Sequence, residues 1–110
     1  MEGAMSARRE SPIACIVDSF SPAERERWEE LGTKWRASVL EIRELPDGYA
    51  LRIPLDAASV LAVAEWMTLD RVCCPFLGFA LEIEREGGPV WLRLTGRPGV
   101  KEFMQQAAGR

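Results

Sequence analysis

The chain contains no histidine, and this absence excludes several common centres of enzyme chemistry. A Ser-His-Asp triad, a Cys-His pair and a Cys2His2 zinc site each need an imidazole, so none of them can form in this protein. An imidazole general base is excluded for the same reason. Those enzyme classes drop out, and any reaction would have to use other side chains.

Long apolar runs and blocks of like charge are missing as well. No run approaches the roughly 20 apolar residues that span a bilayer, and no basic region followed by an apolar stretch opens the sequence. The 17 acidic and 14 basic side chains interleave along the chain and leave a formal charge of -3. Because nucleic acids and anionic lipids attract concentrated positive charge, we expect neither nucleic acid nor a membrane as a partner.

Cysteine is scarce, and its count of three is odd. A secreted domain of this size would normally carry an even number of cysteines at the spacings of a disulfide framework. We therefore expect free thiols and a cytoplasmic location.

The residues that are present fit a single folded domain. The 110 residues are 47% apolar and 28% charged, which is ordinary for a globular protein. A chain of that length can bury a core without disulfides or a structural metal. Residues 1–11 have no apolar periodicity and predict a flexible N-terminus, so we place the α+β domain at residues 12–110.

The first half of the domain predicts a strand, a helix and a hairpin. The apolar run Ile13–Val17 predicts a short buried strand that carries Cys15. Ser21-Pro22-Ala23-Glu24 predicts a helix start, with serine as the N-cap and a glutamate that completes a capping box. An apolar stripe at helical spacing follows at Trp28, Leu31 and Trp35. Alternation over residues 40–53, broken by a Pro-Asp-Gly turn, predicts a hairpin.

The second half predicts another helix, another hairpin and a closing helix. Asp56 can cap the helix, whose apolar face is expected to run up to Val72 and to include Val60, Leu61, Ala64 and Met67. Pro75 disfavours helical backbone at Cys74, so the helix should end at or just before that residue. A hairpin over residues 79–95 turns at two glycines and a proline, and a short helix begins near Pro98.

This order of elements predicts an α+β fold with two layers. Helices lie on one face of a mostly antiparallel sheet, in the ferredoxin-like order β-α-β-β-α-β followed by an extra strand and a C-terminal helix. Alternation places one set of residues on the buried sheet face: Leu40, Ile42, Leu51, Ile53, Leu81, Ile83, Leu92 and Leu94. Charges on the other face are expected to pair across each hairpin, Glu41 with Arg52 and Glu82 with Arg93. The hairpin sequences repeat at an offset of 41 residues, which indicates two copies of one unit or only what amphipathic hairpins share.

Two adjacent thiols, Cys73 and Cys74, stand between the second helix and Pro75. They could fill small apolar space at the helix end, as free cysteines often do. A disulfide between them is disfavoured, because adjacent Cα atoms lie about 3.8 Å apart, below the usual disulfide separation. Alternatively, a turn at Pro75 could bring both sulfurs to one side, where they would bind a soft ion.

A soft-ion site would need ligands from elsewhere in the chain. Cys15 could supply a third ligand if its strand runs beside the Cys-Cys turn, and four-coordinate zinc would also require a carboxylate such as Asp70. Thiol redox or nucleophilic chemistry is the remaining alternative. The negative end of the helix dipole raises a thiol pKa, although Arg71 could offset this and a helical turn with Cys74 as its N-cap would reverse it. The chain has no C-x-x-C motif to support thioredoxin-like exchange.

Three segments around these thiols resemble a family of small, functionally uncharacterised bacterial proteins. They are Asp70-Arg71-Val72-Cys73-Cys74-Pro75-Phe76-Leu77, Trp91-Leu92-Arg93-Leu94-Thr95-Gly96 and Gly99-Val100-Lys101-Glu102-Phe103. That family has an acidic residue and an arginine before Cys-Cys-Pro-Phe, then Leu-Thr-Gly and Gly-x-Lys-x-Phe, often with a cysteine on the first strand, as at Cys15. The resemblance covers roughly residues 12 to 104 and implies no particular activity. Asp70 departs from it, since glutamate is expected there, and would shorten any carboxylate contact near the thiols.

The leading hypothesis is that Cys73 and Cys74, with Cys15, bind a soft metal ion, a metalloid or another thiophilic compound. Asp70 and Arg71 are the supporting residues of that site. A non-catalytic interaction domain with structural cysteines is the alternative, and thiol redox activity ranks third. An enzyme is therefore the less favoured interpretation, no cofactor beyond a soft metal ion is expected, and a homo-oligomer stays open.

Overall fold

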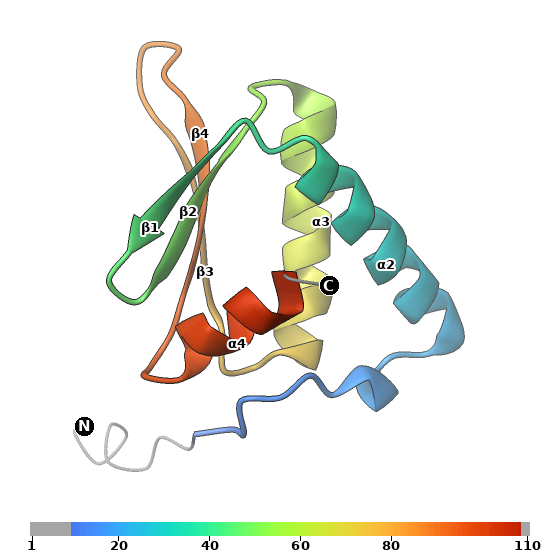
Figure 1. Cartoon of the computed structure of the whole chain (residues 1–110). Helices are drawn as coiled ribbons and strands as arrows, with labels where there is room; N and C mark the ends of the chain where they lie inside the picture. Colours follow the sequence, from blue (N-terminus) through green and yellow to red (C-terminus); the bar gives the residue numbers. More distant parts are fainter. Residues whose placement is uncertain (1–9, 109–110) are drawn as a thin grey trace, which may run out of the picture.

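Within residues 10–108, which the computed structural model describes, the protein has three α-helices, one short 3-10 helix and a four-stranded sheet (Figure 1). In chain order the elements are η1 (Val17–Ser19), α2 (Pro22–Ala37), β1 (Glu41–Leu45), β2 (Gly48–Ile53), α3 (Ala57–Cys73), β3 (Gly78–Ile83), β4 (Val90–Thr95) and α4 (Val100–Ala108). The flexible segment expected at residues 1–11 lies almost entirely outside the described residues and stays a prediction.

The four strands form one antiparallel sheet in the order β1-β2-β4-β3. Helices α2 and α3 lie side by side on one face of this sheet, and α4 lies near one end of the same face (Figure 1). The main core fills the space between the layers with residues that include Leu31, Trp35, Ile53, Val63, Trp66 and Leu92. The two-layer α+β fold predicted from the sequence is therefore confirmed. Among the described residues, no helix combines the length and the apolar character needed to cross a membrane.

The first predicted strand, Ile13–Val17, is wrong. Residues 13–16 have no regular structure, and Val17 begins η1. The sheet offers this segment no central position, because β4 is already paired with β2 on one side and with β3 on the other. The apolar side chains of Ile13 and Val17 pack instead against the end of α3 and the start of α4. The observed order is α-β-β-α-β-β-α, which lacks the first strand of the ferredoxin-like order.

The inner face of the sheet carries the predicted residues, but the helices cover its strands unequally. One row across the sheet consists of Ile42, Leu51, Leu92 and Leu81. Leu92 is fully buried, whereas Ile42 on the edge strand is 63% exposed. Two more of the predicted inner residues, Leu40 and Ile83, are also more than half exposed. The helix layer therefore covers the two central strands and leaves much of the edges in contact with solvent.

The buried face of α3 differs from the predicted one. Leu61, expected in the core, is 66% exposed, and Val72 is exposed too. Val60, Ala64 and Met67 are only half-buried. The buried positions are Ala62, Val63, Trp66, Asp70 and Cys73. Apolar residues occur on nearly every side of this helix, so spacing alone does not identify the stripe that faces the sheet.

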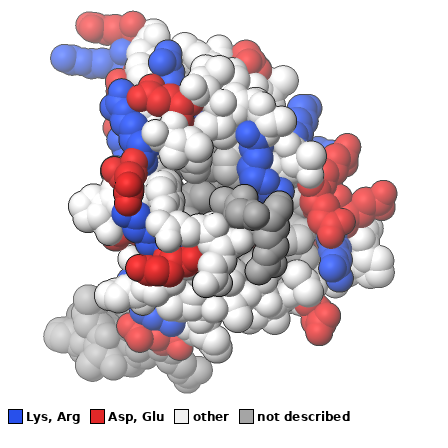
Figure 2. Space-filling model, viewed as in Figure 1, with Lys and Arg blue, Asp and Glu red and all other residues white. Residues whose placement is uncertain are grey.

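The outer face of the sheet carries charges of both signs. Glu41 stands opposite Arg52, with a carboxylate oxygen and a guanidinium nitrogen 3.9 Å apart. Glu82 forms an ion pair with Arg93 across the second hairpin, so the predicted pairing across both hairpins is confirmed. Trp91 lies buried beneath these charges. Figure 2 shows positive and negative side chains intermixed along the side of the molecule that carries the sheet.

The helix ends follow the predicted local signals. Ser21 accepts the N–H of Glu24, and the Glu24 carboxylate accepts the N–H of Ser21, which completes the capping box. Asp56 accepts the N–H of Ser59 at the start of α3. Helix α3 ends at Cys73, so the predicted end before the proline is confirmed.

Candidate thiol site

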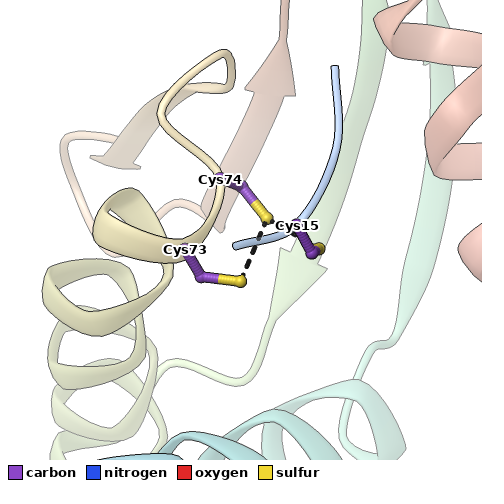
Figure 3. Close-up of side chains that lie close together, drawn as sticks. All are labelled: Cys15, Cys73 and Cys74. Atoms are coloured by element: carbon purple, nitrogen blue, oxygen red, sulfur yellow. Dashed lines mark hydrogen bonds between the residues drawn. The ribbon is translucent and has the colours of Figure 1, made fainter. Parts of the chain in front are cut away.

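Three sulfur atoms converge where α3 ends. The Sγ atoms of Cys15, Cys73 and Cys74 all lie within 4.8 Å of one another. The Cys74 sulfur is 3.1 Å from that of Cys15 and 3.8 Å from that of Cys73. In Figure 3, Cys74 points from the helix end toward the segment that carries Cys15. The structure therefore brings together the three cysteines proposed from the sequence.

The end of α3 explains how two adjacent cysteines can share one site. Neighbouring side chains on a helix point in different directions. Cys73 is the last helical residue, and Cys74 leaves the helix with φ -123° and ψ 70° while its N–H still donates to Asp70 O at 2.7 Å. Pro75 favours such non-helical backbone at the residue before it. The change of direction at Cys74 therefore places its sulfur beside that of Cys73.

Cys15 reaches the site from the N-terminal segment, residues 10–20, which contains η1 and is attached to the end of α3. The N–H of Ile16 donates to the carbonyl oxygen of Cys73 at 2.8 Å. A small apolar cluster, the thiol cluster, is formed by Cys73, Cys74, Phe76 and Val100. The segment packs three apolar side chains against this cluster, those of Ile13, Val17 and Phe20. In Figure 1 the segment passes beneath the lower end of α3.

The three thiols differ in their contact with solvent. Cys73 is fully buried and Cys74 is 4% exposed, whereas Cys15 is exposed. Burial, and to a smaller extent the neighbouring Cys15, raise the pKa of the Cys73 thiol to about 11. Burial also raises the pKa of Cys74, and the negative charge of Asp70 adds to that effect. Both buried thiols are therefore protonated near neutral pH, which disfavours them as nucleophiles.

Asp70 lies buried beside the thiols, with 4% of its surface exposed. Its Oδ1 accepts a hydrogen bond from Trp28 Nε1 at 2.8 Å and lies 3.9 Å from Cys74 Sγ. Burial raises the pKa of this carboxyl group, while the hydrogen bond from Trp28 and the charge of Arg36 oppose that change. Sequence reasoning assigned Trp28 to the core stripe of α2. Helical spacing contains no signal for a contact between residues 42 positions apart, so this residue of the site was missed.

Arg71, the other supporting residue proposed from the sequence, is exposed. It lines an open apolar groove between α3 and β3 together with Met67 and Phe79. The residues lining that groove do not include a cysteine. The basic side chain whose charge reaches the site is instead Arg36, which acts on Asp70.

Three sulfurs at these separations can hold one soft ion. Metal–sulfur bonds of about 2.3 Å at tetrahedral angles would place sulfurs roughly 3.8 Å apart, which is close to the observed distances. All three thiols are free, since even the closest pair, at 3.1 Å, is well beyond a disulfide bond of about 2.05 Å. The chain has no imidazole, and the carboxylate beside the site already accepts a hydrogen bond from Trp28. Among the residues that the structure describes, the site thus offers three thiol ligands and no ready fourth ligand.

Comparisons of the chain with known protein families, with curated proteins and with solved structures found no match. The resemblance to small bacterial proteins therefore stays a prediction. The chemistry of the three thiols is the remaining guide to function.

Proposed function

We propose that the protein binds a soft metal ion or a thiophilic metalloid compound through Cys15, Cys73 and Cys74. One observation carries the proposal: thiols from two segments 59 residues apart in the chain meet with all their sulfurs within 4.8 Å. Sulfur ligands select soft ions, whereas hard cations such as Mg²⁺ prefer oxygen. The ligand set therefore supports a thiophilic ligand.

The exposed position of Cys15 argues against a purely structural role for all three thiols. Cys73 and Cys74 fill the thiol cluster as small apolar side chains would. Cys15 is exposed and gains little from packing, yet its sulfur lies 3.1 Å from that of Cys74. An interaction domain with structural cysteines, the alternative, leaves this contact unexplained.

The gradient of burial supports an inward transfer of the ligand. An incoming ion would meet the exposed Cys15 first, then Cys74 at 3.1 Å, and finally the fully buried Cys73. A metal cation must displace the thiol protons. Because the pKa values of Cys73 and Cys74 are raised, these two thiols hold their protons firmly. Below its pKa of about 11 the Cys73 thiol is protonated, and lowering the pH further increases the competition of protons with the cation for the sulfur. Uptake of such a cation should therefore weaken as the pH falls.

A reducing compartment is part of the proposal. We place the protein in the cytoplasm, where free thiols persist because cellular reductants prevent stable disulfides. Oxidation of Cys15 and Cys74 to a disulfide would remove two of the three ligands.

Titration of the reduced protein with Hg(II) or Cd(II) tests the proposal, with ultraviolet thiolate-to-metal absorption and native mass as readouts. The wild type should take up one ion per chain, and Cys73→Ser or Cys74→Ser should each abolish tight uptake. Cys15→Ser should weaken uptake, because Cys15 is the closest sulfur partner of Cys74. The affinity for Cd(II) should also fall when the pH is lowered from about 8 to about 6, because protons compete with the ion for the sulfur atoms.

Phe76→Leu is the matched control, because Phe76 packs in the thiol cluster and carries no ligand atom. This variant should lose stability and still bind the ion. Wild-type affinity in the Cys73→Ser, Cys74→Ser double variant would overturn the proposal, and the structural interpretation of these cysteines would then hold.

A further inference from the structure

Within residues 10–108, no lysine or arginine side chain is hydrogen-bonded to the thiol site, that is, to the side chains of the three cysteines and of Asp70. An acidic group lies beside the buried sulfurs, since Asp70 Oδ1 is 3.9 Å from Cys74 Sγ. Arg36, the basic side chain whose charge reaches the site, acts on this carboxylate. A negatively charged complex would therefore add its charge to a buried region that already holds an acidic group.

Three thiolates determine the net charge of any complex formed here. A monovalent ion such as Cu(I) would leave two negative charges, and a divalent ion such as Zn(II) would leave one. A trivalent metalloid would leave none. Burying an unpaired charge is costly, and Cys73 and Cys74 are at most 4% exposed. The environment therefore favours a complex that is neutral.

The number of available ligands also favours a trivalent metalloid. Structural Zn(II) sites take four ligands in a tetrahedral arrangement, and this site offers three sulfurs without any histidine. Asp70 Oδ1 could be a fourth ligand only by giving up or sharing the hydrogen bond from Trp28 Nε1 at 2.8 Å. As(III) and Sb(III) carry a lone pair and are complete with three sulfur bonds.

We infer that the site takes a trivalent metalloid hydroxide, arsenite or antimonite, as a three-coordinate complex with Cys15, Cys73 and Cys74, in preference to zinc. This inference rests on the proposed function and narrows its ligand class. In the reaction of As(OH)3 with three thiols, three As–S bonds form while three As–O bonds and three S–H bonds break. Each thiol proton leaves with one hydroxide as water. Arsenic stays trivalent, so no oxidant or reductant is needed.

A competition experiment tests the ligand class. Protein reduced with a phosphine, which offers no competing thiol, is titrated with arsenite alone, with Zn(II) alone and with both. Native mass and the count of free thiols should show one arsenic per chain and the loss of all three thiols. Arsenite should bind at least about tenfold more tightly than Zn(II). Displacement of bound arsenite by an equal concentration of Zn(II) would overturn the inference.

Cys15→Ser distinguishes binding by three sulfurs from binding by two. With only Cys73 and Cys74 available, arsenic must keep one hydroxide, so the mass that arsenite adds to the protein should be larger by one water than in a complex with three sulfur bonds. Arsenite affinity should also fall about tenfold or more. Unchanged affinity would show that Cys15 is not a ligand and would overturn the three-coordinate complex.

Asp70→Asn tests whether the carboxylate is a ligand, because an asparagine oxygen can still accept the hydrogen bond from Trp28. Asp18→Asn, the same change at an exposed aspartate in η1, is the matched control. Arsenite affinity should agree between the two variants within about twofold. A loss of about tenfold confined to Asp70→Asn would add the carboxylate to the ligands and overturn the inference.

The inference and the proposed function fail in different ways. If Hg(II) or Zn(II) binds through the cysteines and arsenite does not, the ligand class is wrong and the proposed function stands. If neither arsenite nor Hg(II) binds in a way that depends on Cys73 and Cys74, the proposed function is itself wrong.

Discussion

The two helix-hairpin units of the protein, α2-β1-β2 and α3-β3-β4, share one plan and differ where the helix ends. In the first unit, Ser38 after α2 keeps a helical backbone, with φ -94° and ψ -3°, before the chain reaches β1. In the second unit, Cys74 leaves the helical conformation and Pro75 follows. Of the two connections, only the second carries cysteine, and the N-terminal segment packs against it. The candidate site therefore depends on a few residues in one connection of a repeated scaffold.

The central strands show how closely the two units correspond. Leu51 of β2 stands directly opposite Leu92 of β4, and these positions are separated by the offset of 41 residues found in the sequence. On the edge strands the offset is 39, because Ile42 and Leu81 occupy the same row. Paired positions in this row are 11 residues apart along the chain in the second hairpin and 9 in the first, which accounts for the change. The units match best where their strands meet in the core.

Replacing the two opposing leucines tests whether the units contribute equally to the core. Leu92 is fully buried, whereas Leu51 is half-buried. Leu92→Ala should lower the free energy of unfolding by about 2 to 5 kcal/mol, because it leaves a cavity, and Leu51→Ala should lower it by less. Urea denaturation measures both losses. Equal losses would remove this difference between the units, and a near-neutral Leu92→Ala would contradict the strand register.

The helix caps of the two units should contribute similarly to the free energy of unfolding, unlike the two core leucines. Ser21 and Asp56 each accept the N–H of the residue three positions later. Ser21→Ala and Asp56→Ala should therefore each lower the free energy of unfolding by about 0.5 to 2 kcal/mol. Thermal unfolding of the two variants provides the comparison. A loss seen in one unit and not in the other would mean that the two helix starts are held by different interactions.

The smallest effects are expected from the ion pairs on the outer face of the sheet. Glu82 and Arg93 are in closer contact than Glu41 and Arg52, whose charged atoms are 3.9 Å apart. Double-mutant cycles to alanine should give coupling energies of about 0.2 to 1 kcal/mol, with the larger value in the second hairpin. High salt should reduce both values, since exposed charges are screened. The opposite ranking of the two hairpins would be inconsistent with the observed distances.

The parts of the fold that have strong local signals could be predicted from the sequence. The capping box at Ser21 and the turn at Pro46-Asp47-Gly48 depend on neighbouring residues, and both occur where expected. The end of α3 before Pro75 follows from a steric clash within one dipeptide. For the same reason, the adjacent cysteines could be proposed as a pair that leaves the helix at a turn.

The features that depend on distant residues could not be predicted. The run Ile13–Val17 is short enough to fit several structures, and its place is decided by a sheet whose central strands are already paired. Cys15 lies beside the other cysteines because this segment packs on the end of α3, and not because it forms a strand. The contact between Trp28 and Asp70 likewise depends on how α2 lies against α3.

The attachment of the N-terminal segment to the end of α3 also has a consequence for the topology of the chain. A ligand bonded to both Cys15 and Cys74 would close a covalent ring that encloses α2, β1, β2 and α3, because these cysteines are 59 residues apart. A closed ring of about 60 residues lowers the conformational entropy of the unfolded chain, which raises the free energy of unfolding by about 4 kcal/mol. A ligand bound at the end of α3 would then make the whole first unit more resistant to unfolding.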